Sequence, residues 1–250
     1  MPLLSVNVNK VATLRNSRGG ELPSVCAAVR VCLDAGARGI TVHPRADQRH
    51  ITPHDVREIA RLLAQVGPGV EFNIEGDPRP DLIDLVLETR PHQCTLVPVQ
   101  PGEVTSQAGW GRTGEVAAIL ERSVRRLRDA GVRVSLFIDP DRQAADWAAE
   151  LGADRVELFT EPFARAFAQG AAAGRDSFEQ YATVARHAHA RRLGINAGHD
   201  LDLDNLPLFA TLPHLAEVSI GHALISRALF QGLHAVVREY LAVCAQPHRA

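Results

Sequence analysis

Short apolar segments alternate with longer amphipathic segments along most of the chain. The short segments are rich in β-branched residues and end at polar loops, a pattern typical of buried strands. They predict eight strands, at Leu3–Asn9, Gly39–His43, Val70–Glu75, His92–Pro98, Val132–Ile138, Arg155–Phe159, Leu193–Ala197 and Leu215–Ile220.

The segments between these strands carry apolar residues at helical spacing. Three of them end at glycines, Gly36, Gly131 and Gly152, which is typical of the residue just past a helix. The periodicity predicts helices at Leu22–Ala35, Thr52–Leu63, Pro80–Thr89, Thr113–Ala130, residues 139–151, two within Glu161–Arg192, Leu203–Thr211 and Gly221–Ala245.

Each strand with its following helix spans roughly 25–35 residues, the length of a βα unit. Eight such units in 250 residues match one closed barrel. We therefore predict an α/β fold, a single (β/α)₈ barrel domain over residues 1–250 with additional helices. An open doubly wound sheet is the main alternative. Such a sheet commonly carries a Gly-rich phosphate-binding motif after its first strand. The loop Arg15–Gly20 has no GxGxxG, which argues against this alternative.

Side chains of a strand point alternately to its two faces, and here one face is aliphatic while the other is polar. Because the aliphatic face packs on the helices, the polar face is expected to line the barrel interior. Two of its members, Glu71 and Glu157, need partners or a polar ligand, since an unpaired buried carboxylate is costly. Internal ion pairs with Arg15, Arg18 or Arg45 are the alternative, purely structural explanation.

Composition changes this picture little but excludes several functions. Hydrophobic residues make up 46% of the chain and the net charge is −2, so nothing indicates nucleic acid or a membrane surface as a partner. The four cysteines form no CxxC pair, and neither a signal peptide nor a bilayer-spanning segment is recognisable. We expect a reducing, cytoplasmic setting.

The carboxyl ends of the strands carry an unusual concentration of histidines, cations and amides. Such ends converge on one face of a barrel, where active sites lie. Histidine suits proton transfer near neutral pH, and arginine binds phosphate. The candidates are Asn7, Asn9, Lys10, Arg18, His43, Arg45, His50, Thr105, His199, Gly221 and His222. They indicate an enzyme that acts on small phosphorylated substrates by proton transfer.

The helix after the last strand begins at Gly221 and His222, and its free N–H groups offer an anion site at the position usual for barrel enzymes. A metal site is the weaker interpretation. His43, His50, His199 and Glu71 could ligate zinc, but no HxH or HExxH spacing supports it, so no metal is expected.

Six ordered motifs resemble the pyridoxine 5′-phosphate synthase family, and the similarity runs over about residues 4–240. The motifs are Asn7–Gly19, Gly39–His43 continued through Arg49–Thr52, Leu96–Pro98 with Glu103–Thr105, Val134–Asp139, Asn196–His199 and Ile220–Ala223.

The resemblance implies a (β/α)₈ barrel, an octamer, and no metal or organic cofactor. It implies condensation of 3-amino-2-oxopropyl phosphate with 1-deoxy-D-xylulose 5-phosphate to pyridoxine 5′-phosphate, phosphate and water. By this resemblance His43 and Glu71 are proton acceptors, His199 is the proton donor and Glu157 stabilises the transition state. The implied aminoketone phosphate site comprises Asn7, Arg18, Asp200, Gly221 and His222. The implied deoxyxylulose phosphate site comprises Asn9, Lys10, Arg45, His50 and Thr105.

Three positions depart from the common family pattern. Many members carry Asp-His in place of Asn9-Lys10, and many carry Gly in place of Asp200. We hypothesise that the Asp200 side chain turns away from the phosphate and that only its backbone N–H is used. The segment after Glu71 also differs, which leaves the register open between Glu71 and Glu75 as the base.

Two other functions are alternatives. Another barrel lyase or isomerase could act on a phosphosugar, although a lyase that forms an enzyme imine needs an interior lysine and Lys10 is the sole lysine of the chain. A non-catalytic phospho-ligand sensor would lack the acid–base residues, which are present here.

Overall fold

The structure, a computed structural model, describes residues 1–99 and 106–246. Eight parallel strands close into a barrel in chain order, with β1 paired to β8. The strands are β1 (Leu3–Asn7), β2 (Gly39–Val42), β3 (Glu71–Gly76), β4 (Gln93–Leu96), β5 (Arg133–Ile138), β6 (Arg155–Leu158), β7 (Gly194–Ala197) and β8 (Leu215–Ile220). The predicted (β/α)₈ architecture is confirmed.

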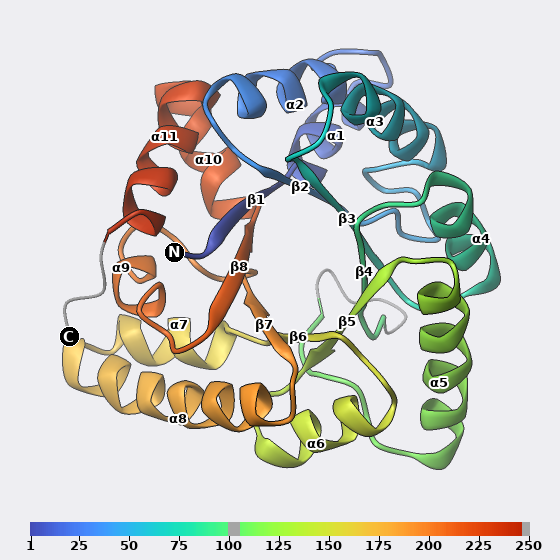
Figure 1. The fold of residues 1–250 in the computed structure, drawn as a ribbon. Helices are drawn as coiled ribbons and strands as arrows, with labels where there is room; N and C mark the ends of the chain where they lie inside the picture. The colour runs from blue at the N-terminus through green and yellow to red at the C-terminus, as the bar shows by residue number, and fades with distance from the viewer. Residues whose placement is uncertain (100–105, 247–250) are drawn as a thin grey trace.

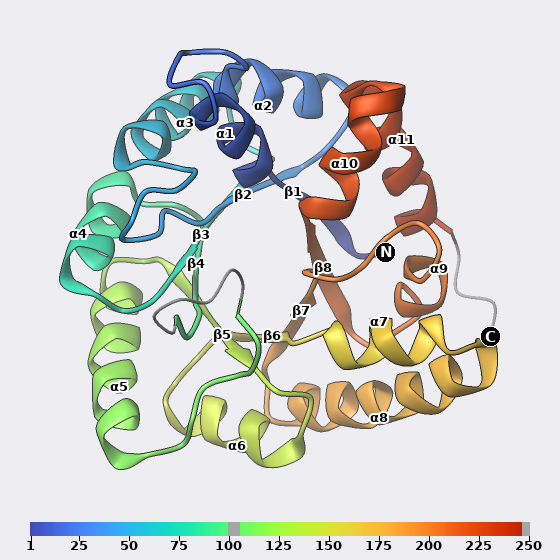
Figure 2. The same ribbon diagram turned by 180° about the vertical axis from the view of Figure 1, so that it is seen from behind.

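A ring of helices surrounds the barrel, as the views from its two ends show (Figure 1, Figure 2). The helices are α1 (Asn9–Asn16), α2 (Val25–Asp34), α3 (Pro53–Val66), α4 (Pro80–Thr89), α5 (Gly114–Asp129), α6 (Arg142–Glu150), α7 (Glu161–Ala168), α8 (Ala171–Ala190), α9 (Leu206–Phe209), α10 (His222–Gln231) and α11 (Leu233–Cys244). Within the described part of the chain, no helix is both long and apolar enough to cross a bilayer.

Two local features differ from the sequence-based expectation. The first strand ends at Asn7 rather than Asn9, because the Asn7 side chain accepts a hydrogen bond from the Asn9 backbone N–H at 3.0 Å and turns the chain into α1. The predicted closing helix is divided at Gly232, whose φ of 87° lies in the left-handed region that a helix cannot accommodate.

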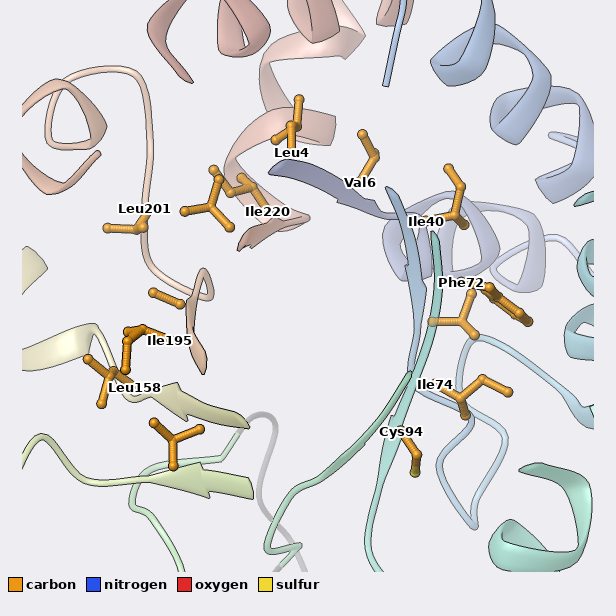
Figure 3. Packing of buried hydrophobic residues seen from close by; sticks show 14 of the residues in the cluster. Leu4, Val6, Ile40, Phe72, Ile74, Cys94, Leu158, Ile195, Leu201 and Ile220 are labelled. Atoms are coloured by element: carbon orange, nitrogen blue, oxygen red, sulfur yellow. The ribbon is translucent and has the colours of Figure 1, made fainter. Parts of the chain in front are cut away.

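The apolar face of each strand packs outward on the helices. Val6, Ile40 and Ile74 are fully buried and point away from the barrel axis toward the surrounding helices (Figure 3). This outer layer between sheet and helices is the main hydrophobic core. The barrel interior is therefore left to the opposite, polar face of the strands, as predicted.

Polar groups inside the barrel satisfy one another across neighbouring strands. In the middle layer the Ser5 and Thr41 hydroxyls are 2.7 Å apart, and Thr95 donates to Asn73 at 3.0 Å. Near the amino ends lies a set we call the lower network, which consists of Glu71, Gln93, Arg133, Arg155, Asn196 and Glu217. Arg133 contacts both Glu71 and Gln93, and Arg155 contacts both Asn196 and Glu217.

Candidate active site

A cavity of about 570 Å³ opens at the carboxyl ends of the strands, a volume typical of small-molecule sites. Most of the predicted site residues line it: Asn7, Asn9, Lys10, His43, Arg45, His50, Glu157, His199, Asp200, Gly221 and His222. Side chains from strands on all sides of the barrel thus meet in one chamber.

The prediction that Glu71 belongs to this chamber is wrong. Glu71 is the first residue of β3, at the amino end of the barrel, where it is ion-paired with Arg133. Glu75 lies four residues further on the same face, about 13 Å along the strand at about 3.3 Å per residue. Glu75 lines the cavity, and its Oε2 is 3.8 Å from His43 Nδ1. Because side chains alternate between the two faces of a strand, both carboxylates point into the barrel. Their positions along the barrel axis differ, and these positions are visible only in the folded structure.

One further predicted residue, Arg18, is not among the described residues that line the cavity. Arg18 is exposed in the turn after α1, so its assignment to a phosphate site is not supported by the geometry of one chain. Thr105 lies outside the described residues. Arg15, on the same helix end, is paired with Asp55 at 2.5 Å and holds α1 against α3.

His43 is held as a neutral base. Its backbone N–H donates to Asn9 Oδ1 at 2.9 Å, which fixes the end of β2, and its Nε2 is buried without a hydrogen-bond partner among the described residues. Burial, reinforced by the charge of Arg45, lowers the pKa of His43 well below 6.5. An unprotonated imidazole with an unused ring nitrogen is ready to accept a proton.

Glu75 has the opposite preference. Burial, together with the charge of Glu217, raises the pKa of Glu75 to about 8, so its carboxyl group holds a proton at neutral pH. Asn7 Nδ2 donates to its Oε2 at 3.5 Å and keeps it beside His43. Two neighbouring groups whose environments push their protonation in opposite directions are typical of an acid–base site.

Glu157 is a second buried carboxyl group of the chamber, on β6. Burial, followed by the charge of Glu75, raises its pKa well above 4.5. Burial thus favours its neutral carboxyl form, a hydrogen-bond donor, over the carboxylate, which suits it to stabilise developing charge on an oxygen.

The other wall of the cavity is cationic. Lys10 and Arg45 lie there with His50, and the Arg45 guanidinium is buried. His50 Nδ1 accepts the Ile51 backbone N–H at 2.9 Å, so the proton of its neutral ring is on Nε2. Burial, then the charge of Arg45, lowers the pKa of His50 to about 4, so it is a neutral donor. Such a wall fits a phosphate group.

A second anion position lies where α10 begins at Gly221 and His222. The free N–H groups of this helix end face the chamber. A Cβ on Gly221 would lie 3.0 Å from the Asn7 Cβ, so glycine lets the helix end approach β1.

Two contacts of Asp200 bear on the hypothesis that only its backbone N–H binds the phosphate, which stays a prediction. The side-chain Oδ2 is 3.1 Å from His199 Nδ1. The backbone N–H of Asp200, however, donates to Thr160 Oγ1 at 3.3 Å and so is already engaged within the protein.

Sequence reasoning missed further residues of the site. Ser219 and Phe137 line the cavity from β8 and β5, and Ser219 follows the same strand parity that identified the other polar residues. Arg79 donates to the Pro44 carbonyl at 2.5 Å and ties down the loop between His43 and Arg45; no local pattern indicates that contact. Over residues 1–99 and 106–246, no three His, Cys, Asp or Glu side chains are grouped to hold a metal ion.

Comparison with known proteins shows the family of the chain. Residues 4–246 match the family described as pyridoxal phosphate biosynthesis protein PdxJ. The chain is 51% identical to the pyridoxine 5′-phosphate synthase of Xanthomonas campestris pv. campestris strain B100, with 97% of this chain and 96% of the relative covered. It is 48% identical to the synthase of Leptospira biflexa, with 97% of each covered.

Among solved structures, the YdjI aldolase from Escherichia coli K12 superposes with a TM-score of 0.61 at 13% identity, covering 97% of this chain and 87% of that one. That likeness shows the barrel fold alone. The family match over nearly the whole chain and the near-half identity to its members lead to one conclusion: this chain belongs to the PdxJ family of pyridoxal phosphate biosynthesis proteins.

Proposed function

We propose that this protein is a pyridoxine 5′-phosphate synthase, which joins 3-amino-2-oxopropyl phosphate to 1-deoxy-D-xylulose 5-phosphate. The observation that carries the proposal is a single chamber lined both by anion-binding groups and by the acid–base residues His43, Glu75, Glu157 and His199. Relatives at 48–51% identity are pyridoxine 5′-phosphate synthases, which supports the same activity.

The reaction needs proton transfers rather than a protein nucleophile. The substrate amine adds to the ketone of the deoxysugar phosphate and forms an imine with loss of water. Removal of C–H protons, loss of inorganic phosphate and loss of a second water then close the aromatic ring. Each step calls for a positioned acid or base. We assign proton acceptance to His43 and Glu75, proton donation to His199 and charge stabilisation to Glu157.

The two phosphates are assigned to the two anion positions. The deoxyxylulose phosphate binds at the cationic wall formed by Lys10, Arg45 and His50, near Asn9. The aminoketone phosphate binds at the start of α10, at Gly221 and His222, near Asn7. Neither assignment needs a metal or an organic cofactor.

The direct test is incubation with both phosphorylated substrates. Pyridoxine 5′-phosphate is followed by absorbance and inorganic phosphate by a separate assay, for wild type and His43→Ala. We expect equal molar yields of the two products from wild type and a loss of about 10²-fold or more in the variant. Phosphate release without pyridoxine 5′-phosphate would contradict the proposal.

Another barrel lyase remains the second candidate, because Lys10 lines the cavity and could form an imine with a carbonyl substrate. Borohydride with the deoxysugar phosphate would then trap a covalent adduct on Lys10. We expect no adduct by mass spectrometry.

We also propose an octamer that works in the cytoplasm. Phe230 is 90% exposed and Leu229 65% exposed on α10, an apolar pair of a kind that subunit contacts cover. Cys26, Cys32, Cys94 and Cys244 are free thiols, which suits a reducing compartment. Analytical ultracentrifugation of wild type and Phe230→Glu measures the assembly; a monomeric wild type would contradict it.

A further inference from the structure

The turn after β7 places a carboxylate beside the proposed proton donor. Asp200 Oδ2 is 3.1 Å from His199 Nδ1, and both residues line the chamber. The turn is pressed against β8, because a Cβ on Gly198 would lie 1.9 Å from the Ser219 carbonyl oxygen. Glycine is therefore required at the position that brings His199 over the reacting space.

Asp200 itself is anchored from two directions. Its backbone N–H donates to the fully buried Thr160 at 3.3 Å. Its carbonyl oxygen accepts from the Nδ2 of buried Asn205 at 3.1 Å. With the backbone held on both sides, the carboxylate lies next to the imidazole, and the two side chains are 32% and 38% exposed.

Resting on the proposed function, we infer that Asp200 is the positioning residue of His199. Its carboxylate accepts the Nδ1–H hydrogen bond, so that Nε2 is the atom that exchanges protons with the substrate. The protonated imidazole gives its Nε2 proton to the departing hydroxyl group, which leaves as water. His199 keeps the Nδ1 proton, and Asp200 remains ionised throughout, as an orienting carboxylate does in a nucleophile–His–Asp triad.

This role also explains how a negative side chain is tolerated next to an anion site. The Asp200 charge is directed to the His199 ring rather than to the helix end at Gly221 and His222. Among the described residues, Glu157 on β6 and His43 after β2 also lie toward His199, and burial disfavours the charged form of both. Asp202 lines the cavity from the same loop, but its Oδ1 accepts the Asp204 and Asn205 backbone N–H groups.

The test compares Asp200→Ala with Asp204→Asn, which removes the same charge from an exposed position of the same loop. Nitrogen-15 spectra of histidine-labelled protein report which ring nitrogen carries the proton, and the His199 signals are identified by their loss in His199→Asn. We expect an Nδ1-protonated neutral His199 in wild type and in Asp204→Asn. In Asp200→Ala the proton should move to Nε2.

Kinetics supply the second readout. A misplaced donor should lower kcat by about 10- to 100-fold in Asp200→Ala, with KM for the aminoketone phosphate within about twofold of wild type. Asp200→Glu should recover part of kcat, and circular dichroism should show all variants folded. Asp204→Asn should match wild type.

Two outcomes would overturn the inference. One is an unchanged His199 tautomer in Asp200→Ala. The other is a large gain in affinity for the aminoketone phosphate with kcat preserved, which would show that Asp200 acts only by repelling the substrate. Either outcome is distinct from failure of the proposed function, because that failure would appear as an inactive wild type.

Discussion

The two halves of the barrel interior are both polar, yet they handle their charges in opposite ways. In the lower network each carboxylate has a guanidinium partner, as in Arg155 with Glu217 at 3.2 Å. In the upper half, around the cavity, Glu75 and Glu157 are buried without an arginine partner in the described structure, and His43 has an unused ring nitrogen.

The difference separates a structural use of buried polarity from a chemical one. Paired charges in the lower network replace the branched apolar layers that normally fill such a barrel. Groups without an arginine partner in the upper half are costly to bury, and burial raises the pKa of Glu75 to about 8. Burial also raises the pKa of Glu217 in the lower network, but only to about 7, because the charge of Arg155 opposes the shift. Catalysis is therefore expected where buried ionisable groups lack ion-pair partners, and polarity of the interior alone does not indicate it.

The sharpest comparison between the halves is Glu75→Gln against Glu71→Gln. Glu75→Gln removes a proton acceptor and should lower kcat/KM by about 10²- to 10⁴-fold. Glu71→Gln alters a group at the far end of the barrel and should leave kcat/KM within about twofold of wild type. Steady-state rates of pyridoxine 5′-phosphate formation measure both. Equal losses of kcat/KM in the two variants would contradict the assignment of catalysis to the upper half alone.

The largest stability effect is expected from Arg155→Ala. It leaves the Glu217 carboxyl group buried without its partner, and removing one member of a buried ion pair costs about 3–5 kcal/mol. The free energy of unfolding from urea titration is the measurement. His43→Ala, which deletes a buried group outside the lower network, serves as the comparison. A loss below about 1 kcal/mol for Arg155→Ala would contradict a structural lower network.

The pH dependence of the upper half follows from Glu75. Its pKa is about 8 in the folded protein against an ordinary 4.5, so the folded state keeps a proton that the unfolded chain has lost. The stability from the neutral group is present in full below pH 4.5 and is lost as pH rises through 8. For the reaction, kcat/KM should rise as pH approaches 8, because a proton acceptor must be ionised.

Measuring kcat/KM and the urea midpoint between pH 5 and 9 tests both predictions, the rise of kcat/KM and the fall of stability with increasing pH. Glu75→Gln is the matched control, since glutamine cannot ionise and this contribution to the slope of stability with pH should vanish. A wild-type activity profile that is flat across this range would contradict the assignment of Glu75.

The smallest effect is expected from Arg133→Met. The Arg133–Glu71 pair is about one-third exposed, 27% and 34% for the two side chains, so solvent screens it. Its loss should lower the free energy of unfolding by about 1 kcal/mol or less, without a change in kcat/KM. A loss of unfolding free energy comparable to that of Arg155→Ala would show that burial does not determine how much an ion pair of the lower network contributes to stability.

Local patterns were sufficient for much of the molecule. Strand spacing predicted the closed barrel, and alternation in segments such as Ile40–His43 predicted which side chains face inward. The same alternation could not distinguish Glu71 from Glu75, because residues four apart share a face. Helix α1 was missed because the side-chain hydrogen bond of Asn7 that starts it leaves no periodic signal.

The amino-acid sequence by itself determined the order of the strands, the polar lining and the residue types available for proton transfer, because periodicity and side-chain chemistry are local properties. Only the tertiary structure decided which of those polar groups are paired and which are not. The partner of Glu71, for example, is Arg133 on β5, whereas Glu75 on the same strand as Glu71 has no arginine partner among the described residues. Depth along the barrel axis, which sets both pairing and pKa, exists only once the eight strands have closed in register.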